Sequence, residues 1–281
     1  MSSFQLQQLP SLPIKEVFKS LGVCDLLNLC RSSNKSRRLV KKSLKDITFT
    51  LKIVAEEKHY KIWLKEDFSK HKARIRAENS NGTSLFKNIR WLMHTFWVET
   101  VYLDCTNVEE GDVVKVVEYL KKEKPYYLKL YFECPMISDS LWQLMLNCEA
   151  DVLIISVDRE VKVTFDNVPL LFNCECIILH GVKFSEKGMN LLFKTWQSSK
   201  ERTLQCVSLT RKLGPFWKKQ ANEKVVLKGI DVESVEKKRI FKVKKDGIKK
   251  STTYNLVKND GELATLKFDK QEICFHTEND R

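Results

Sequence analysis

Glycine is scarce in this sequence, at 9 of 281 residues. An average protein contains about 7 % glycine. A loop that cradles phosphate groups needs several glycines close together, because the backbone must approach the ligand. The scarcity therefore argues against nucleotide-binding enzymes built on such loops. It favours a scaffold of regular helices and strands.

Long apolar runs are also missing. The longest charge-free stretch, Met1 to Ile14, contains serines, glutamines and prolines, whereas a signal peptide or a span of about 20 residues needs a continuous apolar run. The nine cysteines are an odd number and include no C-x-x-C pair, which favours reduced thiols over a disulfide framework. We therefore expect a cytoplasmic or nuclear protein that neither is secreted nor spans a membrane.

Motifs for catalysis are absent as well. The five histidines show no H-E-x-x-H spacing, and no serine lies in a G-x-S-x-G turn, so we expect no catalytic residue, no cofactor and no enzyme activity. Cys174, Cys176 and His180 could in principle offer three zinc ligands. Because Cys174 occupies an apolar position of an expected strand, we interpret it as a buried structural thiol and expect no metal.

Acidic residues are few in two parts of this basic chain, whose net charge is +13. The segment 31–45 carries seven basic and no acidic residues, and the segment 211–250 carries fourteen basic and five acidic residues. Lysines concentrated in 237–250 could neutralise nucleic-acid phosphates. Alternating lysines also protect an exposed edge strand from aggregation. We therefore interpret this segment as a solvated face of a sheet, and nucleic-acid binding is the alternative interpretation.

The first 45 residues predict three short helices. Ile14, Val17, Phe18 and Leu21 recur at helical spacing after Pro10 and Pro13, and proline suits a first helical turn. Ser33 or Asn34 can begin the third helix. Three short helices carry too little chain to bury all of these apolar side chains, so some are expected to face a partner.

The same residues resemble an F-box. The resemblance is carried by Leu9-Pro10, Val17-Phe18, Leu21, Asp25-Leu26-Leu27 and Ser32-Ser33, and it is closest to the large F-box family of nematodes. Pro13 and the lack of a tryptophan in the third helix depart from the usual pattern. The resemblance implies binding to a Skp-type adaptor and, through it, to a cullin. The expected adaptor-binding residues are Leu9, Pro10, Val17, Phe18, Leu21, Leu26 and Leu27.

Alternation of apolar and polar residues replaces the helical period in two other parts of the chain. In the segment 46–83 it predicts two or three antiparallel strands that link the F-box to the central part of the chain. In the segment 211–281 it predicts a basic antiparallel β region. Asp260-Gly261 lies between two alternating runs there and indicates a hairpin with a type I′ turn.

A weak repeat marks the segment 84–210, where apolar-x-x-apolar-x-apolar triplets alternate with helical faces. This pattern predicts a leucine-rich-repeat-like βα solenoid. Nearby, Trp91, Phe96 and Trp97 could line a ligand groove, but their helical spacing favours a place in the core. The triplets are Val98/Val101/Leu103, Pro125/Leu128/Leu130, Ala150/Leu153/Ile155, Cys174/Ile177/Leu179 and Leu204/Val207/Leu209.

Asp166–Trp196 and Asp260–Leu266 are similar to the type 2 F-box-associated region. The expected fold is thus α+β, with an F-box (1–45), a β-hairpin linker region (46–83), a βα region (84–210) and a basic β region (211–281). The resemblance implies the substrate-recognition subunit of an SCF-type cullin–RING ubiquitin ligase, with an unknown target protein. A basic nucleic-acid-binding scaffold, or a scaffold that binds the adaptor outside a ligase, remains the alternative.

Overall fold

The computed structural model shows two compact units, a first unit of Met1–Tyr131 and a second unit of Phe132–Arg281. Within them, the structure describes residues 10–56, 59–66, 72–78, 83–106, 109–123, 126–135, 137–163, 165–199, 204–210, 222–233, 243–244, 247–248, 252–269 and 272–277.

The chain begins with three helices, α1 (Ser11–Ser20), α2 (Val23–Ser32) and α3 (Asn34–Ser43). Ser33 caps α3 as predicted, because its hydroxyl oxygen accepts a hydrogen bond of 3.0 Å from the backbone N–H of Ser36. α2 contacts β2 and β3, and α3 contacts α4. The three helices therefore pack against the rest of the first unit and do not stand alone.

A sheet forms the body of the first unit. β1 (Thr48–Glu56), β2 (His59–Glu66) and β3 (Lys72–Glu78) are antiparallel, which agrees with the strands predicted in 46–83. β1 also pairs in parallel with β4 (Trp97–Asp104), so these strands are part of the sheet and not a separate linker. The strand order is β3-β2-β1-β4-β5, with β5 formed by Tyr126–Cys134.

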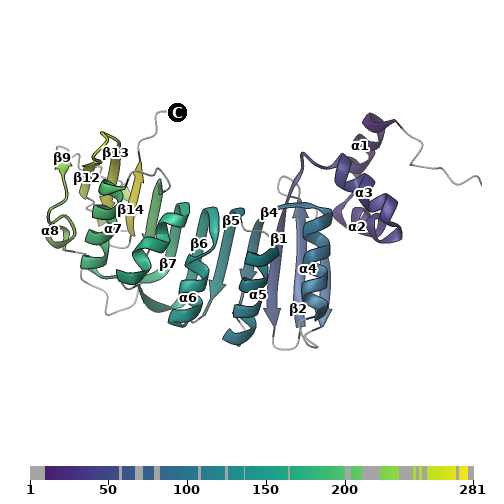
Figure 1. The fold of residues 1–281 in the computed structure, drawn as a ribbon, viewed down its shortest axis with the longest axis horizontal. Coiled ribbons are helices and arrows are strands. Elements are labelled where there is room, and N and C mark those ends of the chain that lie inside the picture. Colours follow the sequence, from purple (N-terminus) through teal and green to yellow (C-terminus); the bar gives the residue numbers. More distant parts are fainter. Residues whose placement is uncertain are drawn as a thin grey trace, which may run out of the picture. The chain divides into compact units, whose positions relative to one another are not determined.

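Two helices, α4 (Thr83–Thr95) and α5 (Glu110–Glu123), lie on one face of this sheet (Figure 1). Apolar side chains at alternate strand positions, such as Leu51, Ile53 and Leu103, are buried. α5 contributes Val113, Val116, Val117 and Leu120, as its predicted helical face requires. The remaining strand positions are only half-buried, so the opposite face of the sheet is accessible to solvent.

The second unit begins with α6 (Asp139–Leu146), β6 (Glu149–Val163), the 3₁₀ helix η2 (Phe165–Asn173), β7 (Cys174–Phe184), α7 (Glu186–Ser198) and β8 (Cys206–Thr210). It continues with α8 (Glu223–Val226), β9 (Val232–Glu233), β12 (Thr252–Val257), β13 (Leu263–Phe268) and β14 (Glu272–Thr277). The strand order is β6-β7-β8-β14-β13-β12-β9. β10 (Val243–Lys244) and β11 (Gly247–Ile248) form a second, two-stranded antiparallel sheet.

The predicted solenoid is wrong. β6, β7 and β8 are parallel, but β8 continues into antiparallel pairing with β14, and β13 and β12 follow in the same sense. A solenoid requires one strand direction throughout, since each repeat stacks on the last. The pattern also assigns Leu128 to a buried strand position, but Leu128 is 45 % exposed, whereas Tyr127 and Leu130 are buried. The sequence triplets identify strands, but the fold is a mixed α+β sheet.

The hairpin predicted at Asp260-Gly261 joins β12 and β13, which pair in antiparallel fashion. Its turn is longer than the expected two residues. The N–H of Lys258 donates to the carbonyl of Glu262 at 2.8 Å, and the N–H of Gly261 donates to the carbonyl of Lys258 at 2.9 Å. Gly261 has φ = 86°, as expected for the glycine that ends a three-residue loop.

Candidate partner-binding site

The residues predicted to bind an adaptor divide into an interior and an exterior set. Phe18 is 0 % exposed, and Leu26 and Leu27 are each 4 % exposed, so these three side chains form the core of the N-terminal helices. The expectation that they are exposed does not hold for them, because α1 and α2 pack together with α3. Leu9 lies outside the described residues.

The exterior set consists of Pro10, Val17 and Leu21. Pro10 is exposed, and Val17 and Leu21 are half-buried. Val17 lies in the last two turns of α1, whereas Pro10 and Leu21 are the residues that cap its two ends. We name these three residues the α1 edge. An apolar edge that remains partly open on a small helical module fits a protein partner better than solvent.

An ion pair fixes α1 beside the end of α3. The Lys15 Nζ atom lies 2.6 Å from a carboxylate oxygen of Asp46. The hydrogen bond from the Lys15 ammonium group lowers the pKa of the Asp46 carboxyl. Because Asp46 is exposed, solvent screens this interaction, so its role is to orient α1 more than to stabilise the fold.

A row of cations and aromatic rings crosses the accessible face of the first unit's sheet. The strand register brings Arg74 beside Trp63, Trp63 beside Lys52, and Lys52 beside Tyr102. Tyr131 stacks on Tyr102, with the ring centroids 4.3 Å apart and the planes 9° from parallel. We name these five residues the cation–aromatic row.

The rings of this row interact with cations of neighbouring strands. The guanidinium carbon of Arg74 lies 5.3 Å from the ring centroid of Trp63, and the Lys52 Nζ atom lies 4.1 Å from that of Tyr102. Such contacts are electrostatic attractions between a cation and the negative ring face. They leave ring edges, guanidinium and ammonium groups at the surface, which suits polar and aromatic side chains of a protein partner.

Three aromatic residues expected in the core have different surroundings. Phe96 is buried, and its ring meets that of Phe49 with centroids 5.0 Å apart. Trp91 is half-buried and lines a hollow between α3 and α4. Trp97 is 55 % exposed, so its assignment to the core is wrong. It stands at the start of β4, where its indole N–H donates to the Glu99 carboxylate at 2.7 Å.

Three cysteines of the second unit, Cys174, Cys206 and Cys274, have thiol pKa values raised above the ordinary value. Burial raises the pKa of Cys174 to about 11 and that of Cys274 to about 12, and a hydrogen bond with Cys176 together with burial raises the pKa of Cys206. A protonated thiol is a poor nucleophile and a poor metal ligand. Cys174 is buried as expected, and its thiol donates to the carbonyl of Cys148 at 3.5 Å.

Cys174, Cys176 and His180, weighed as metal ligands, lie in the part of the chain that the structure describes. No group of three or more histidine, cysteine, aspartate or glutamate side chains is placed there to hold a metal ion.

The lysine-rich segment weighed as a nucleic-acid site falls mainly outside the described residues, so that alternative stays untested. The residues of that segment which lie outside are Lys237, Lys238, Arg239, Lys242, Lys245, Lys249 and Lys250.

Sequence reasoning missed the cation–aromatic row. The available signal was the identity of the outward positions: Trp63, Tyr102 and Tyr131 are aromatic where a solvated strand face carries small polar residues. Alternation alone assigns these positions to solvent. Only the register of the paired strands shows that they form one continuous row.

Two family models match parts of the chain. Residues 6–48 match the family model described as F-box domain, and residues 142–209 match the model described as F-box associated. The first match covers α1–α3, and the second runs from α6 to β8. Searches of curated proteins and of solved structures return no match.

The described helices include none with the length and apolar character needed to cross a bilayer. F-box domains generally bind Skp-type adaptors, and the three-helix N-terminus has the arrangement of such a domain. The chain is an F-box protein with a type 2 F-box-associated region.

Proposed function

We propose that this protein is the substrate-recognition subunit of an SCF-type cullin–RING ubiquitin ligase and acts in the cytoplasm or nucleus. The observation that carries the proposal is the combination of an F-box with an F-box-associated region in one chain. The subunit itself performs no bond chemistry. It raises the rate of ubiquitin transfer by holding a target near the conjugating enzyme, so that binding replaces a rare encounter.

The adaptor contacts the α1 edge in this proposal. Val17 and Leu21 supply apolar surface, and Pro10 extends it at the start of the helix. Phe18, Leu26 and Leu27 act indirectly, because they hold α1 and α2 in place from inside the F-box. A few well-packed residues near the centre of an interface carry most of its binding energy.

The target contacts the cation–aromatic row together with Trp97. Tryptophan, tyrosine and arginine are the residues most enriched among the energetic centres of protein interfaces. The first unit thus contains both an adaptor edge and a target surface. The F-box-associated region in the second unit adds further recognition surface.

A nucleic-acid-binding scaffold is the second candidate, and the same row is the observation that favours it. Single-stranded nucleic acids stack their bases on aromatic rings of open sheets. Here, however, Tyr102 already stacks on Tyr131 and has Lys52 close to its ring centroid. A base would have to displace these contacts, so we favour a protein target.

We expect Val17→Asp to weaken adaptor binding by about tenfold or more, since it places a charge in the apolar centre of the interface. Co-precipitation and calorimetry with a Skp-type adaptor measure the loss. Asn28→Asp is the matched control, because Asn28 is exposed on α2 and gains the same charge. No binding by the intact protein would overturn the ligase proposal, and full binding by folded Val17→Asp would overturn the α1 edge.

We expect the double variant Trp97→Ala, Lys52→Glu to lose target proteins while it keeps the adaptor. Quantitative mass spectrometry of affinity-purified complexes provides the measurement, with Lys122→Glu on α5 as the control for charge. A point variant is preferable to deletion of the N-terminus, because deletion would uncover the surfaces that α2 and α3 cover on β2, β3 and α4. An unchanged set of partners would exclude the row as the target surface.

A further inference from the structure

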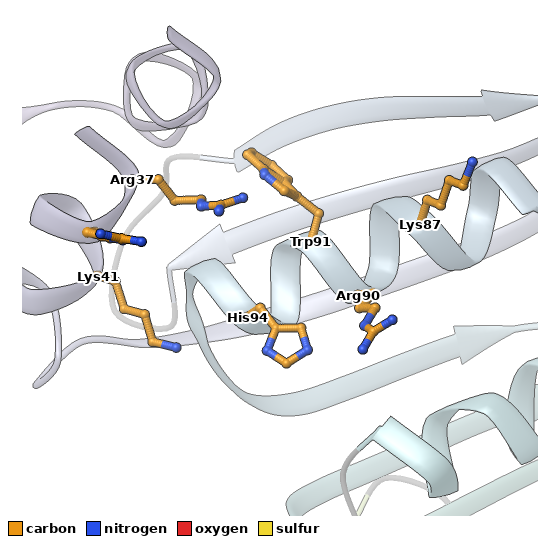
Figure 2. Close-up of a pocket in the computed structure, with 7 residues that line it drawn as sticks. Arg37, Lys41, Lys87, Arg90, Trp91 and His94 are labelled. Carbon is orange, nitrogen blue, oxygen red and sulfur yellow. The ribbon is translucent and has the colours of Figure 1, made fainter. Parts of the chain in front are cut away.

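A basic hollow of about 560 Å³ lies between α3 of the F-box and α4 of the same unit. α3 contributes Arg37, Arg38 and Lys41, and α4 contributes Lys87 and Arg90. Figure 2 shows the side chains of Arg37 and Lys41 extending from α3 toward the side of α4 that carries the indole of Trp91. Five cationic side chains thus converge on one concave surface.

Helical spacing explains the convergence. Lys87, Arg90, Trp91 and His94 follow one another at intervals of three, one and three residues, which places them along one stripe of α4. Arg37 and Lys41 are four residues apart and face that stripe from α3 (Figure 2). The charges are therefore held by two rigid helices and not by a loop.

Few negative charges offset this cluster. On the α4 side, a carboxylate oxygen of Glu123 lies 3.7 Å from the Nε atom of Arg90, and the other lies 3.5 Å from the Nε2 atom of His94. In the described parts of the chain, no carboxylate forms an ion pair with Arg38, Lys41 or Lys87. Like charges held close together repel one another, so the hollow is stabilised when an anion enters it.

We propose that the hollow binds a small, multiply phosphorylated anion. Guanidinium groups form paired hydrogen bonds with phosphate oxygens, and three arginines line this site. The volume matches that of pockets for small molecules, which is about 300–1,000 Å³. A nucleic-acid strand would instead need charges distributed along an extended track.

The proposal also explains the surroundings of Trp91. The guanidinium carbon of Arg31 lies 5.7 Å from its ring centroid, so a further cation lies close to the indole that lines the hollow. Because the chain is poor in glycine, side chains and not a backbone loop must hold the phosphate groups. A bound anion would bridge α3 and α4 and so fix the F-box against the sheet of its own unit.

The test uses the full chain and inorganic tripolyphosphate as the probe, measured by calorimetry at about 150 mM salt. We expect binding that the double variant Arg38→Glu, Lys41→Glu weakens by about tenfold or more, because two charge-assisted hydrogen bonds are lost. The matched control is Lys35→Glu, Lys42→Glu, which changes the same net charge at exposed positions of the same helix. We expect the control to bind nearly as well as the intact protein.

Several outcomes would overturn the proposal. Equal weakening by both double variants would mean that net charge alone attracts the anion. Citrate binding as tightly as tripolyphosphate would mean that the hollow does not select phosphate. A single-stranded oligonucleotide that binds tighter and loses affinity in the same variant would make the hollow part of a nucleic-acid surface. No binding of tripolyphosphate by the intact, folded chain would exclude the site outright.

Discussion

Replacing Phe18 by Asp is expected to unfold the F-box helices and thereby to abolish adaptor binding. The side chain is 0 % exposed between helices that are only ten residues long. Removing a buried phenyl ring costs about 3–5 kcal/mol. An aspartate there also buries a carboxylate without a cationic partner, which adds several kcal/mol more. The combined loss is a large share of the roughly 5–15 kcal/mol that stabilises a typical domain, so we expect α1–α3 to unfold.

A substitution at the neighbouring residue Val17 distinguishes a loss of folding from a loss of direct contact with the adaptor. Val17→Asp introduces the same residue one position away on the partly open α1 edge, so we expect it to keep the helices folded and to lose only the adaptor. Hydrogen exchange of the amides in α1–α3, measured beside adaptor binding, distinguishes the two variants. If Phe18→Asp kept native protection but lost the adaptor, Phe18 would be a direct contact. If it kept both, the core assignment would be wrong.

The helices of the first unit illustrate what periodicity can predict. Apolar residues at intervals of three and four place α1 and α5 correctly, and Ser33 caps α3 because its hydroxyl can accept the N–H of Ser36. These features depend on residues within one or two turns of each other. Local interactions of this kind can be predicted from the residue types and their spacing.

Strand pairing is less accessible, because it depends on residues far apart in the chain. Alternation identifies β1, β2 and β3, but it contains no sign that β1 also pairs in parallel with β4. The same limit produced the mistaken solenoid. Triplets at similar spacing indicate strands, and only the antiparallel pairing of β8 with β14 shows that the repeat does not continue.

The candidate sites likewise differ in how far apart their residues lie in the sequence. The residues of the α1 edge are close together in the sequence, and their role in binding stays a prediction. The burial of Phe18 required knowledge of how α1 packs with α3. The cation–aromatic row and the basic hollow each join residues from elements separated by tens of positions. Composition signalled the basic segment 31–45, but it could not show that α4 supplies the opposite wall.

Gly181→Ala is expected to destabilise the second unit by about 3 kcal/mol or more, because it combines backbone strain with a steric clash. Gly181 has φ = 77°, a conformation that residues with a side chain rarely adopt. An added Cβ atom would lie 2.3 Å from the carbonyl oxygen of Val157. This oxygen belongs to β6 at the point where its register with β7 shifts, after Ser156. Both partners are strand backbone, so neither can move without breaking the ladder.

Substitutions at two other glycines distinguish the cost of backbone strain from the cost of a steric clash. Gly261 also has a positive φ, of 86°, but an added Cβ atom meets nothing within 4 Å, so Gly261→Ala should cost about 1 kcal/mol from strain alone. Gly111 lies in α5 with open space around it, and Gly111→Ala should stabilise the first unit by about 0.5–1 kcal/mol. Urea unfolding followed by the fluorescence of Trp142 and Trp196 measures the two changes in the second unit. Equal losses for Gly181→Ala and Gly261→Ala would show that β6 yields to the added methyl group. A larger loss for Gly181→Ala would identify the contact with Val157 as the constraint that requires glycine in β7.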